Sequence, residues 1–225
     1  MLDWDSIFSD ACWFHWTGIT PAISESVADV LQEALAVART KGLTISADLN
    51  YRKNLWKWGK KAGEVMPDLI QYCDLIIGNE EDAEKVYGIQ GKDVNVNTGH
   101  VEAGSYQTVC EELARLNPHA KRIAITLRGS YSASHNGWSA VLWDQGRFYT
   151  GQKYDIFPIV DRVGGGDSFA GGLIYGLLHY PDAENALKFA IAASCLKHSI
   201  RGDFNEVSIT EVENLLKDNS GRISR

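Results

Sequence analysis

The stretch VDRVGGGDSFAGG, residues 160–172, contains the features that decide the fold. A β-favouring apolar run at 156–160 leads into the glycines 164–166, and Asp167 then opens an amphipathic segment that reaches about His179. Because glycine has no Cβ, a glycine turn brings successive backbone N–H groups close to a ligand. Those groups and the positive end of a helix dipole bind anions. The stretch therefore predicts a strand, an anion-binding turn and a helix.

Asp167 in this stretch has two interpretations. It is either a helix N-cap beside a simple turn, or a carboxylate placed in an anion site for chemistry. A carboxylate repels a resting anion, so the second arrangement suits a hydroxyl that attacks the anion and must lose its proton. The residues alone leave both interpretations open.

The string DRVGGGDSF, residues 161–169, resembles the signature D-x-x-G-A-G-D-x-F of the ribokinase-like (PfkB) carbohydrate kinases. Gly165 stands where that family mostly has alanine, a change that keeps the turn. The resemblance implies a ribokinase-like three-layer α/β/α fold with a doubly wound, mostly parallel sheet. It also implies an ATP-dependent kinase in which Asp167 is the catalytic base and Gly164, Gly165 and Gly166 bind the transferred phosphoryl group.

Composition excludes several classes of protein. The 225 residues are 44% hydrophobic and 23% charged, which is typical of a globular protein. The net charge of −7 gives no global basic field for nucleic acid. The four cysteines are far apart and without metal-site spacing, which predicts free thiols in a reducing compartment. No apolar run approaches the roughly 18 residues of a membrane span and no leader is recognisable, so we expect a cytoplasmic protein without a membrane partner.

Periodicity and turn residues predict the order of the elements. Strands alternating with helices up to residue 127 favour a parallel sheet with helices on both faces, in one domain over 1–218 with a disordered tail at 219–225. Ser24 is the expected N-cap of the second helix and Gly42 its end. A polar surface loop is expected at 88–103. The expected strands are 11–17, 43–48, 74–78, 122–127, 131–134, 138–143, 147–150 and 156–160, and the expected helices 1–8, 24–42, 57–72, 80–87, 104–116, 168–179, 182–199 and 208–217.

Polar residues follow four of these strands, at 48–53, 79–82, 128–130 and in the glycine turn. Ligands of parallel α/β sheets bind beyond the carboxyl ends of the strands. The four polar strand ends therefore predict one cleft.

The segment DLNYRKNLW, residues 48–56, resembles the segment after the second strand of 2-keto-3-deoxygluconate kinases, a branch of the same family. The resemblance implies that Arg52 binds the carboxylate of a sugar acid, with Asp48 and Asn50 as neighbouring groups. Arginine suits a carboxylate because it donates two parallel N–H bonds. Without the resemblance, a solvated loop arginine is the alternative.

The segment NEED, residues 79–82, resembles the family motif N-x-x-E, which positions hydrated Mg²⁺ and phosphate. Asn79 is then expected to act at the ATP site and Asp82 at the metal, with Glu81 or Glu80 compensating for the shorter aspartate. The alternative is a helix N-terminus, which favours acidic residues through its dipole.

Three further predictions concern the nucleotide and phosphate. TLRG, residues 126–129, resembles the nucleotide loop of the family and implies ATP contacts by Thr126, Gly129 and Arg128. Lys197 and His198 fall where the family lines the adenine pocket, although a packed helix with a cationic end is equally consistent. Arg162 is expected to neutralise charge on the phosphoryl path or to bind the substrate carboxylate, the alternative being an ion pair with Asp161 or Asp155.

The predicted function is ATP- and Mg²⁺-dependent phosphorylation of a sugar-acid hydroxyl, most closely that of 2-dehydro-3-deoxygluconate at position 6, by a chain that forms a homo-oligomer. The resemblance also implies additional strands, a sugar site and a lid ahead of Met1. The alternatives are an inactive nucleotide- or sugar-binding relative and a kinase for fructose or ribose. A dinucleotide-binding oxidoreductase is disfavoured, because Phe169 stands where G-x-G-x-x-G needs its last glycine. Arg201-Gly202-Asp203 resembles a cell-adhesion tripeptide, for which a cytosolic chain has no use.

Overall fold

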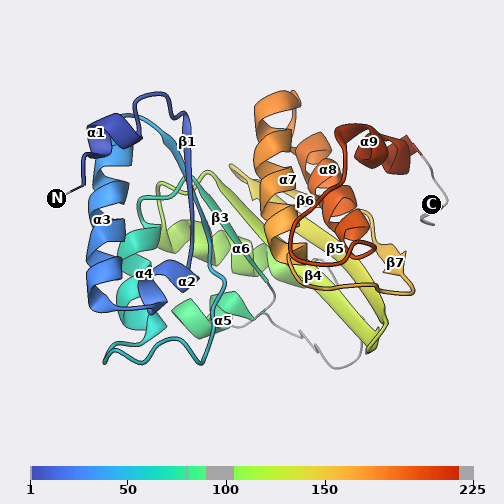
Figure 1. The fold of residues 1–225 in the computed structure, drawn as a ribbon, viewed down its shortest axis with the longest axis horizontal. Coiled ribbons are helices and arrows are strands. Elements are labelled where there is room, and N and C mark those ends of the chain that lie inside the picture. Colours follow the sequence, from blue (N-terminus) through green and yellow to red (C-terminus); the bar gives the residue numbers. More distant parts are fainter. Residues whose placement is uncertain (1, 80, 90–103, 218–225) are drawn as a thin grey trace. The chain divides into compact units, whose positions relative to one another are not determined.

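The structure is a computed structural model that describes residues 2–79, 81–89 and 104–217 (Figure 1). The chain divides into two compact units, Met1–Gly91 with Thr108–Ala124, and Lys92–Gln107 with Ile125–Arg225. A single domain over 1–218 stays a prediction. The tail at 219–225 and most of the loop expected at 88–103 lie outside the described residues. Within them, no helix has the length and apolar character needed to cross a membrane.

The first unit contains a parallel sheet. Strand β1 (Trp13–Thr17) pairs in parallel with β2 (Thr44–Asp48), and β2 pairs in parallel with β3 (Leu75–Asn79). The middle of β2 and nearly all of β3 are buried, as expected for strands of a parallel sheet that helices cover. The predicted α/β arrangement is confirmed for this unit.

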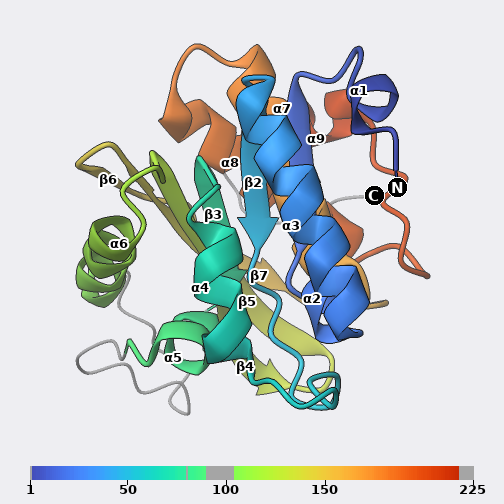
Figure 2. The same cartoon turned by 90° about the vertical axis from the view of Figure 1, so that its left-hand side faces the viewer.

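Helix α3 (Glu25–Thr40) shows how sequence determines the flanking layer. Ser24 is its N-cap and accepts a hydrogen bond from the N–H of Val27, while Gly42 follows its end at a φ of 74°. Both predicted boundaries are confirmed. Its apolar stripe packs on β2, and Figure 2 shows α3 and α4 (Ala62–Ile70) in front of that strand. The other helices of this unit are α1 (Trp4–Ile7), α2 (Ile19–Ala22), α5 (Asp82–Tyr87) and most of α6 (Ser105–Leu116).

The second unit contains antiparallel strands. Strand β5 (His135–Asp144) pairs with β6 (Arg147–Thr150) and with β7 (Tyr154–Ile156), antiparallel in both cases. Gln145 and Gly146 have positive φ values of 49° and 93° and form the turn between β5 and β6.

The predictions for three strands, 122–127, 131–134 and 156–160, are wrong. The first two fall on one continuous strand and the turn after it. Strand β4 (Arg122–Ser132) does not stop at residue 127, because its second half continues beside β5 as one arm of a hairpin. The expected strand at 156–160 is also absent. β7 ends at Ile156, and Pro158 has no N–H with which to continue the pairing. The turn at 164–166 is therefore reached through an irregular segment.

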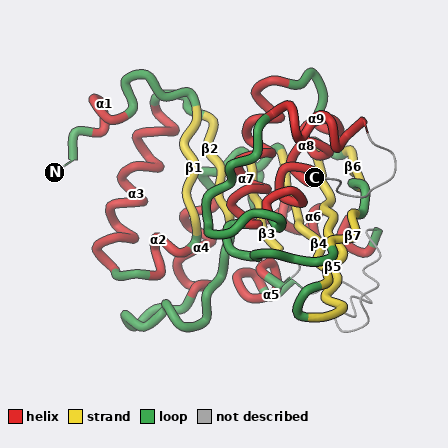
Figure 3. The backbone as a smooth tube through the Cα atoms, turned by 45° about the vertical axis from the view of Figure 1, so that its right-hand side comes forward, coloured by secondary structure: helices red, strands yellow, loops and turns green. Residues whose placement is uncertain are grey.

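Helices α7 (Gly165–His179) and α8 (Ala183–Lys197) pack closely against each other (Figure 1). A Cβ added at Gly176 would lie 2.7 Å from Cα of Ala186, so only glycine allows this approach. Helix α9 (Ile209–Lys217) then packs on α8. Figure 3 shows the segments before α7 and after α8 as loops, and the N–H of Val160 links them by a 2.9 Å hydrogen bond to the carbonyl of His198.

Candidate functional site

Gly164 fixes the turn that precedes α7. It is the N-cap of the helix, with a φ of 75°, and a Cβ there would lie 2.1 Å from the carbonyl oxygen of Asp203. Both facts require glycine. Because the helix begins at Gly165, Asp167 lies inside its first turn, and its interpretation as an N-cap is wrong.

The first turn of α7 presents two free donors. The N–H of Ser168 returns to the carbonyl of Gly164 at 2.8 Å, but within the described residues the N–H groups of Gly166 and Asp167 have no hydrogen-bond partner. A Cβ at Gly166 would meet no atom within 4 Å, so the space beside this backbone is open. Free N–H groups at the positive end of a 15-residue helix are suited to an anion.

The Asp167 side chain is exposed and forms no hydrogen bond or ion pair with any residue that the structure describes. It lies at a cavity of about 540 Å³ between α7, α8 and the segment that follows α8. Most of the cavity wall is apolar or aromatic, which suits a flat base better than a polyhydroxylated sugar. Its lining includes Asp167, Gly171, Tyr175, Phe204, Val207 and Val212.

The end of α8 and the segment after it hold the turn in place. The hydroxyl of Ser194 donates to the carbonyl of Gly165 at 2.6 Å, and the imidazole of His198 would lie 3.1 Å from a Cβ at Gly165. Nδ2 of Asn205 donates to the hydroxyl of Ser168 at 2.6 Å. Sequence reasoning missed Ser194, Asn205 and the role of Gly202-Asp203, because these contacts join residues about 30 or more positions apart. The only local sign of these contacts in the sequence was Gly202, a glycine within a polar segment.

His198 is buried, with 3% of its surface exposed. Its Nδ1 lies 2.8 Å from the carbonyl oxygen of Ser194, and its ring packs 5.1 Å from that of Trp138. Burial lowers the pKa of this imidazole, and the positive charges of Lys197, Arg128 and Arg162 act in the same direction. The ring is therefore neutral at pH 7 and packs against Gly165 of the glycine turn. Its contact with ATP stays a prediction.

Lys197 has no exposed surface. Its ammonium donates to the carbonyl oxygens of Gly202, at 2.7 Å, and Ile200, at 3.2 Å. The structure thus gives the ammonium two backbone partners rather than a place on a cavity wall, and its contact with ATP also stays a prediction.

Arg162 anchors the irregular segment to the β4–β5 hairpin. One guanidinium nitrogen donates to the carbonyls of Ser132 and Ala133, at 2.9 and 2.8 Å, and to Oδ1 of Asn136 at 3.1 Å. Neither alternative ion pair forms. Asp161 accepts backbone N–H groups and Asp155 pairs with His135 instead. A role on phosphate or substrate stays a prediction.

The predicted nucleotide residues Thr126, Arg128 and Gly129 lie inside β4 and not in a loop. Thr126 and Gly129 are buried and Arg128 is exposed. Their contacts with ATP stay predictions.

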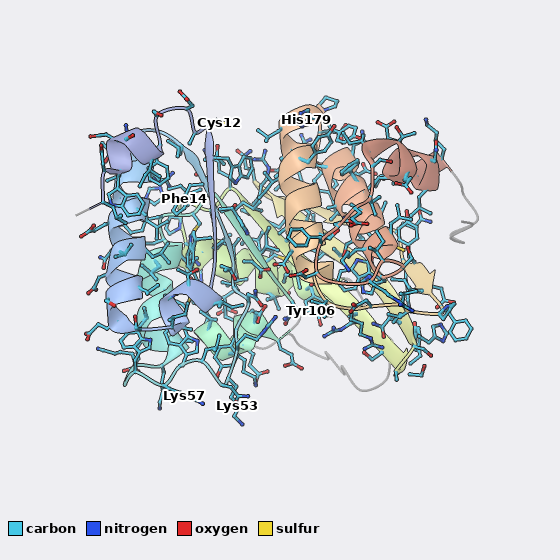
Figure 4. The ribbon with its side chains drawn as sticks, in the orientation of Figure 1. Cys12, Phe14, Lys53, Lys57, Tyr106 and His179 are labelled. Carbon is cyan, nitrogen blue, oxygen red and sulfur yellow. The ribbon has the colours of Figure 1, made fainter. Side chains whose placement is uncertain are left out.

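In the first unit, the residues after β2 form a tight polar turn. Asn50 has a φ of 36°; its N–H donates to Oδ1 of Asp48 at 3.1 Å, and its side-chain amide donates to Thr17 at 3.0 Å. Arg52 is exposed and uses one nitrogen on the carbonyl of Tyr51. Figure 4 shows Lys53 and Lys57 of the same loop extending away from the ribbon. The loop is a cationic surface in an acidic protein.

Asp82 links the loops after β2 and β3. It is 3% exposed, and its two oxygens accept the N–H groups of Tyr51, at 3.1 Å, and Asn79, at 2.9 Å. Burial raises the pKa of its carboxyl despite these bonds. Oδ1 of Asn79 accepts the N–H groups of Glu81 and Asp82. Glu80 lies outside the described residues.

Asp82 is buried and its oxygens accept backbone N–H groups, so of the two residues predicted at the metal only Glu81 is exposed. The roles of Asp82 and Glu81 at Mg²⁺, and of Asn79 at ATP, stay predictions. No group of three or more metal-binding side chains occurs in the part of the chain that the structure describes. The single cleft expected from the strand ends draws on residues of both units and stays a prediction.

Comparison with known proteins gives a consistent result. The profile of the pfkB family carbohydrate kinases matches residues 3–207. A crystal structure of a 2-dehydro-3-deoxygluconokinase from Thermotoga maritima is 45% identical, with a TM-score of 0.86 over 96% of this chain and 63% of its own. The 2-dehydro-3-deoxygalactonokinase of Haloferax volcanii is 29% identical over 97% of this chain and 61% of its own length. The 2-dehydro-3-deoxygluconokinase of Thermoproteus tenax is 28% identical over 94% and 57%. The chain thus spans about 60% of the length of these relatives.

Proposed function

Because the chain belongs to the pfkB family of carbohydrate kinases, we propose that it transfers the γ-phosphoryl group of ATP to a hydroxyl of a sugar acid. The observation that carries this proposal is the arrangement at the start of α7. An exposed carboxylate, Asp167, stands beside the N–H groups of Gly166 and of its own backbone, which have no partner among the described residues. A base and an anion site next to each other are the two functions that the reaction needs.

In the proposed reaction, the acceptor hydroxyl oxygen forms a bond to the γ-phosphorus while the bond from that phosphorus to the β-bridging oxygen breaks and ADP leaves. The hydroxyl proton passes to the Asp167 carboxylate. The two free N–H groups donate to the oxygens of the transferred group, where negative charge is concentrated. Such transfers have loose transition states, so most of the acceleration comes from positioning and electrostatics.

The cavity beside Asp167 supports the assignment of ATP as the donor. Its volume of about 540 Å³ and its apolar wall suit a nucleotide base. Phe204, which is exposed at its edge, offers a face on which a base can stack. The phosphates would then lie toward the first turn of α7.

Two observations support a sugar acid as the acceptor: the cationic loop of the first unit and the names of the relatives. Arg52 is exposed, and within the described residues only one of its nitrogens has a hydrogen-bond partner, so other N–H groups can donate to a carboxylate. The exposed Lys53 and Lys57 increase the local positive charge. All three relatives described above are named for 2-dehydro-3-deoxy sugar acids. We therefore propose a 2-dehydro-3-deoxyaldonate as the acceptor, with 2-dehydro-3-deoxygluconate and phosphorylation at position 6 as the first choice.

In this proposal, Mg²⁺ binds together with the phosphates of the nucleotide. Mg²⁺ keeps several waters and is commonly held by substrate phosphates together with one or two carboxylates. No step of the proposed reaction is assigned to a metal bound by Asp82 or Glu81, which lie in the first unit.

A coupled assay of ADP release, run with calorimetry of ATP binding, tests the proposal. The acceptors are 2-dehydro-3-deoxygluconate, 2-dehydro-3-deoxygalactonate, fructose and ribose. We expect ATP to bind and ADP to be released faster with the two acids than with the neutral sugars. Binding without turnover would support the alternative of an inactive nucleotide-binding protein, whereas preferred turnover of a neutral sugar would overturn the acceptor class.

A further inference from the structure

Lys197 at the end of α8 is a fully buried lysine that forms no salt bridge with any residue the structure describes. Its exposed fraction is 0%, and no carboxylate lies within salt-bridge distance of its ammonium in the part of the chain that the structure describes. Burying a charged ammonium is costly unless polar groups replace its water. Here the carbonyl oxygens of Gly202 and Ile200 do so, at 2.7 and 3.2 Å.

Those two carbonyls belong to the segment that holds the glycine turn in place. The N–H of Gly202 donates to one oxygen of Asp161 at 2.9 Å, and the N–H of Val163 donates to the other at 3.0 Å. The next residue, Asp203, has its carbonyl against Gly164. A continuous set of contacts therefore runs from the Lys197 ammonium to the turn that carries Asp167.

Electrostatics explains why a positive charge is needed at this point. Two carbonyl dipoles that point toward one position, with a carboxylate close by, destabilise one another unless a cation lies among them. The N–H groups of Val163 and Gly202 lower the pKa of Asp161 most strongly, and the charge of Lys197 acts in the same direction. The ammonium thus stabilises both the carbonyls and the charged carboxylate.

We propose that Lys197 is a positioning residue whose ammonium acts as a built-in monovalent cation, holding the 200–203 segment against the glycine turn. It makes the geometry of the turn independent of any free alkali or ammonium ion. Only the ATP-binding readout below rests on the proposed function. The thermal readout does not.

Lys197→Ala tests the proposal because it removes the charge and leaves space for a small cation. K⁺ and NH₄⁺ are small enough to lie between carbonyl oxygens, whereas tetramethylammonium is too large and has no N–H to donate. We expect the variant in tetramethylammonium chloride to have a lower melting temperature and an ATP affinity about tenfold weaker than the wild type. KCl or NH₄Cl at the same ionic strength should reverse both changes, with saturation.

Two matched variants isolate the charge. Lys197→Met keeps most of the side-chain volume without the ammonium, so we expect the same loss and no recovery with K⁺ or NH₄⁺. Lys188→Ala, on the same helix, removes an exposed lysine that pairs with Glu184 at 2.7 Å, and should show no cation-specific response.

Three results would overturn the proposal. The first is a Lys197→Ala variant whose melting temperature and ATP affinity equal those of the wild type in tetramethylammonium chloride. The second is recovery of both quantities to the same extent in all three salts. The third is a saturable, K⁺-specific rise in the melting temperature of the wild type. If Lys197→Ala does not fold in any of the three salts, the melting temperature of the wild type in these salts decides. A built-in cation requires that K⁺ causes no specific rise in that temperature. A wild type that does not bind ATP contradicts the proposed function alone.

Discussion

The hydroxyl of Ser194 donates a 2.6 Å hydrogen bond to the carbonyl oxygen of Gly165, the first residue of α7. Both residues are buried, and they lie 29 positions apart in the sequence. Helix α8 therefore holds the anion-binding end of α7 directly. The positions of the Gly166 and Asp167 N–H groups depend on this bond as well as on the turn itself.

Ser194→Ala removes that bond without adding volume. We expect the free energy of unfolding to fall by about 1 kcal/mol, as is usual when one neutral hydrogen bond is lost. ATP affinity should fall as well, because the first turn of α7 loses its support. Urea denaturation and calorimetry measure the two effects. Ser199→Ala, which removes a 2.6 Å bond from a hydroxyl just beyond α8 to the carbonyl of Leu196, is the control and should leave ATP affinity unchanged.

The glycines of the turn should respond differently to alanine. Gly164→Ala places a Cβ 2.1 Å from the Asp203 carbonyl at a positive φ, so we expect a loss of at least about 2 kcal/mol of stability. Gly166→Ala meets no neighbouring atom and should leave the melting temperature unchanged or slightly raised. Its ATP affinity should nevertheless fall by at least about tenfold, because the phosphates lose their close approach to the backbone. Unaltered ATP binding by Gly166→Ala would contradict the location of the phosphate site.

Arg52→Ala tests the site for the acidic acceptor. A charge-assisted hydrogen bond contributes about 1.5–3 kcal/mol. We therefore expect KM for a 2-dehydro-3-deoxyaldonate to rise at least about tenfold, with little change in kcat. Lys53→Ala, the neighbouring exposed cation, should have a much smaller effect. A neutral sugar whose KM rises as much as that of the acid would refute the assignment of the carboxylate to Arg52.

His198 predicts how stability depends on pH. Because the pKa of His198 is lowered by burial, the unfolded chain takes up a proton near pH 6.5 while the folded chain remains neutral. Stability is therefore complete above pH 6.5 and declines as the pH falls through the lower, folded pKa. Between about pH 7.5 and about pH 5.5, the melting temperature of the wild type should fall more than that of His198→Gln. Equal decreases in the two proteins would show that another group controls this range.

Local sequence signals predicted the parts of the fold that depend on neighbouring residues. Ser24 and Gly42 set the ends of α3, and the glycines before Asp167 mark the turn before α7. One wrong prediction, the strand at 156–160, overlooked a local signal, because Pro158 has no N–H to continue the pairing. The others arose where a distant partner determines the outcome. The extension of β4 to Ser132 requires β5 beside it.

The same limit applies to the site. Asp82 fits an acidic motif in the sequence, but only the folded chain brings the N–H of Tyr51, 31 positions away, onto its carboxylate. The burial of Lys197 and the contact of Asp203 with Gly164 are likewise properties of packing. A charged residue at the end of a helix gives no local sign that its charge will be enclosed.

The central claim is that Asp167 removes the proton of the acceptor hydroxyl. The direct measurement is ADP release by the wild type and by Asp167→Asn with 2-dehydro-3-deoxygluconate, together with the ATP affinity of both. We predict a kcat at least about 100-fold lower for Asp167→Asn, with nearly unchanged KM and ATP affinity. Turnover by Asp167→Asn at the wild-type rate, with ATP bound equally by both proteins, would contradict the claim.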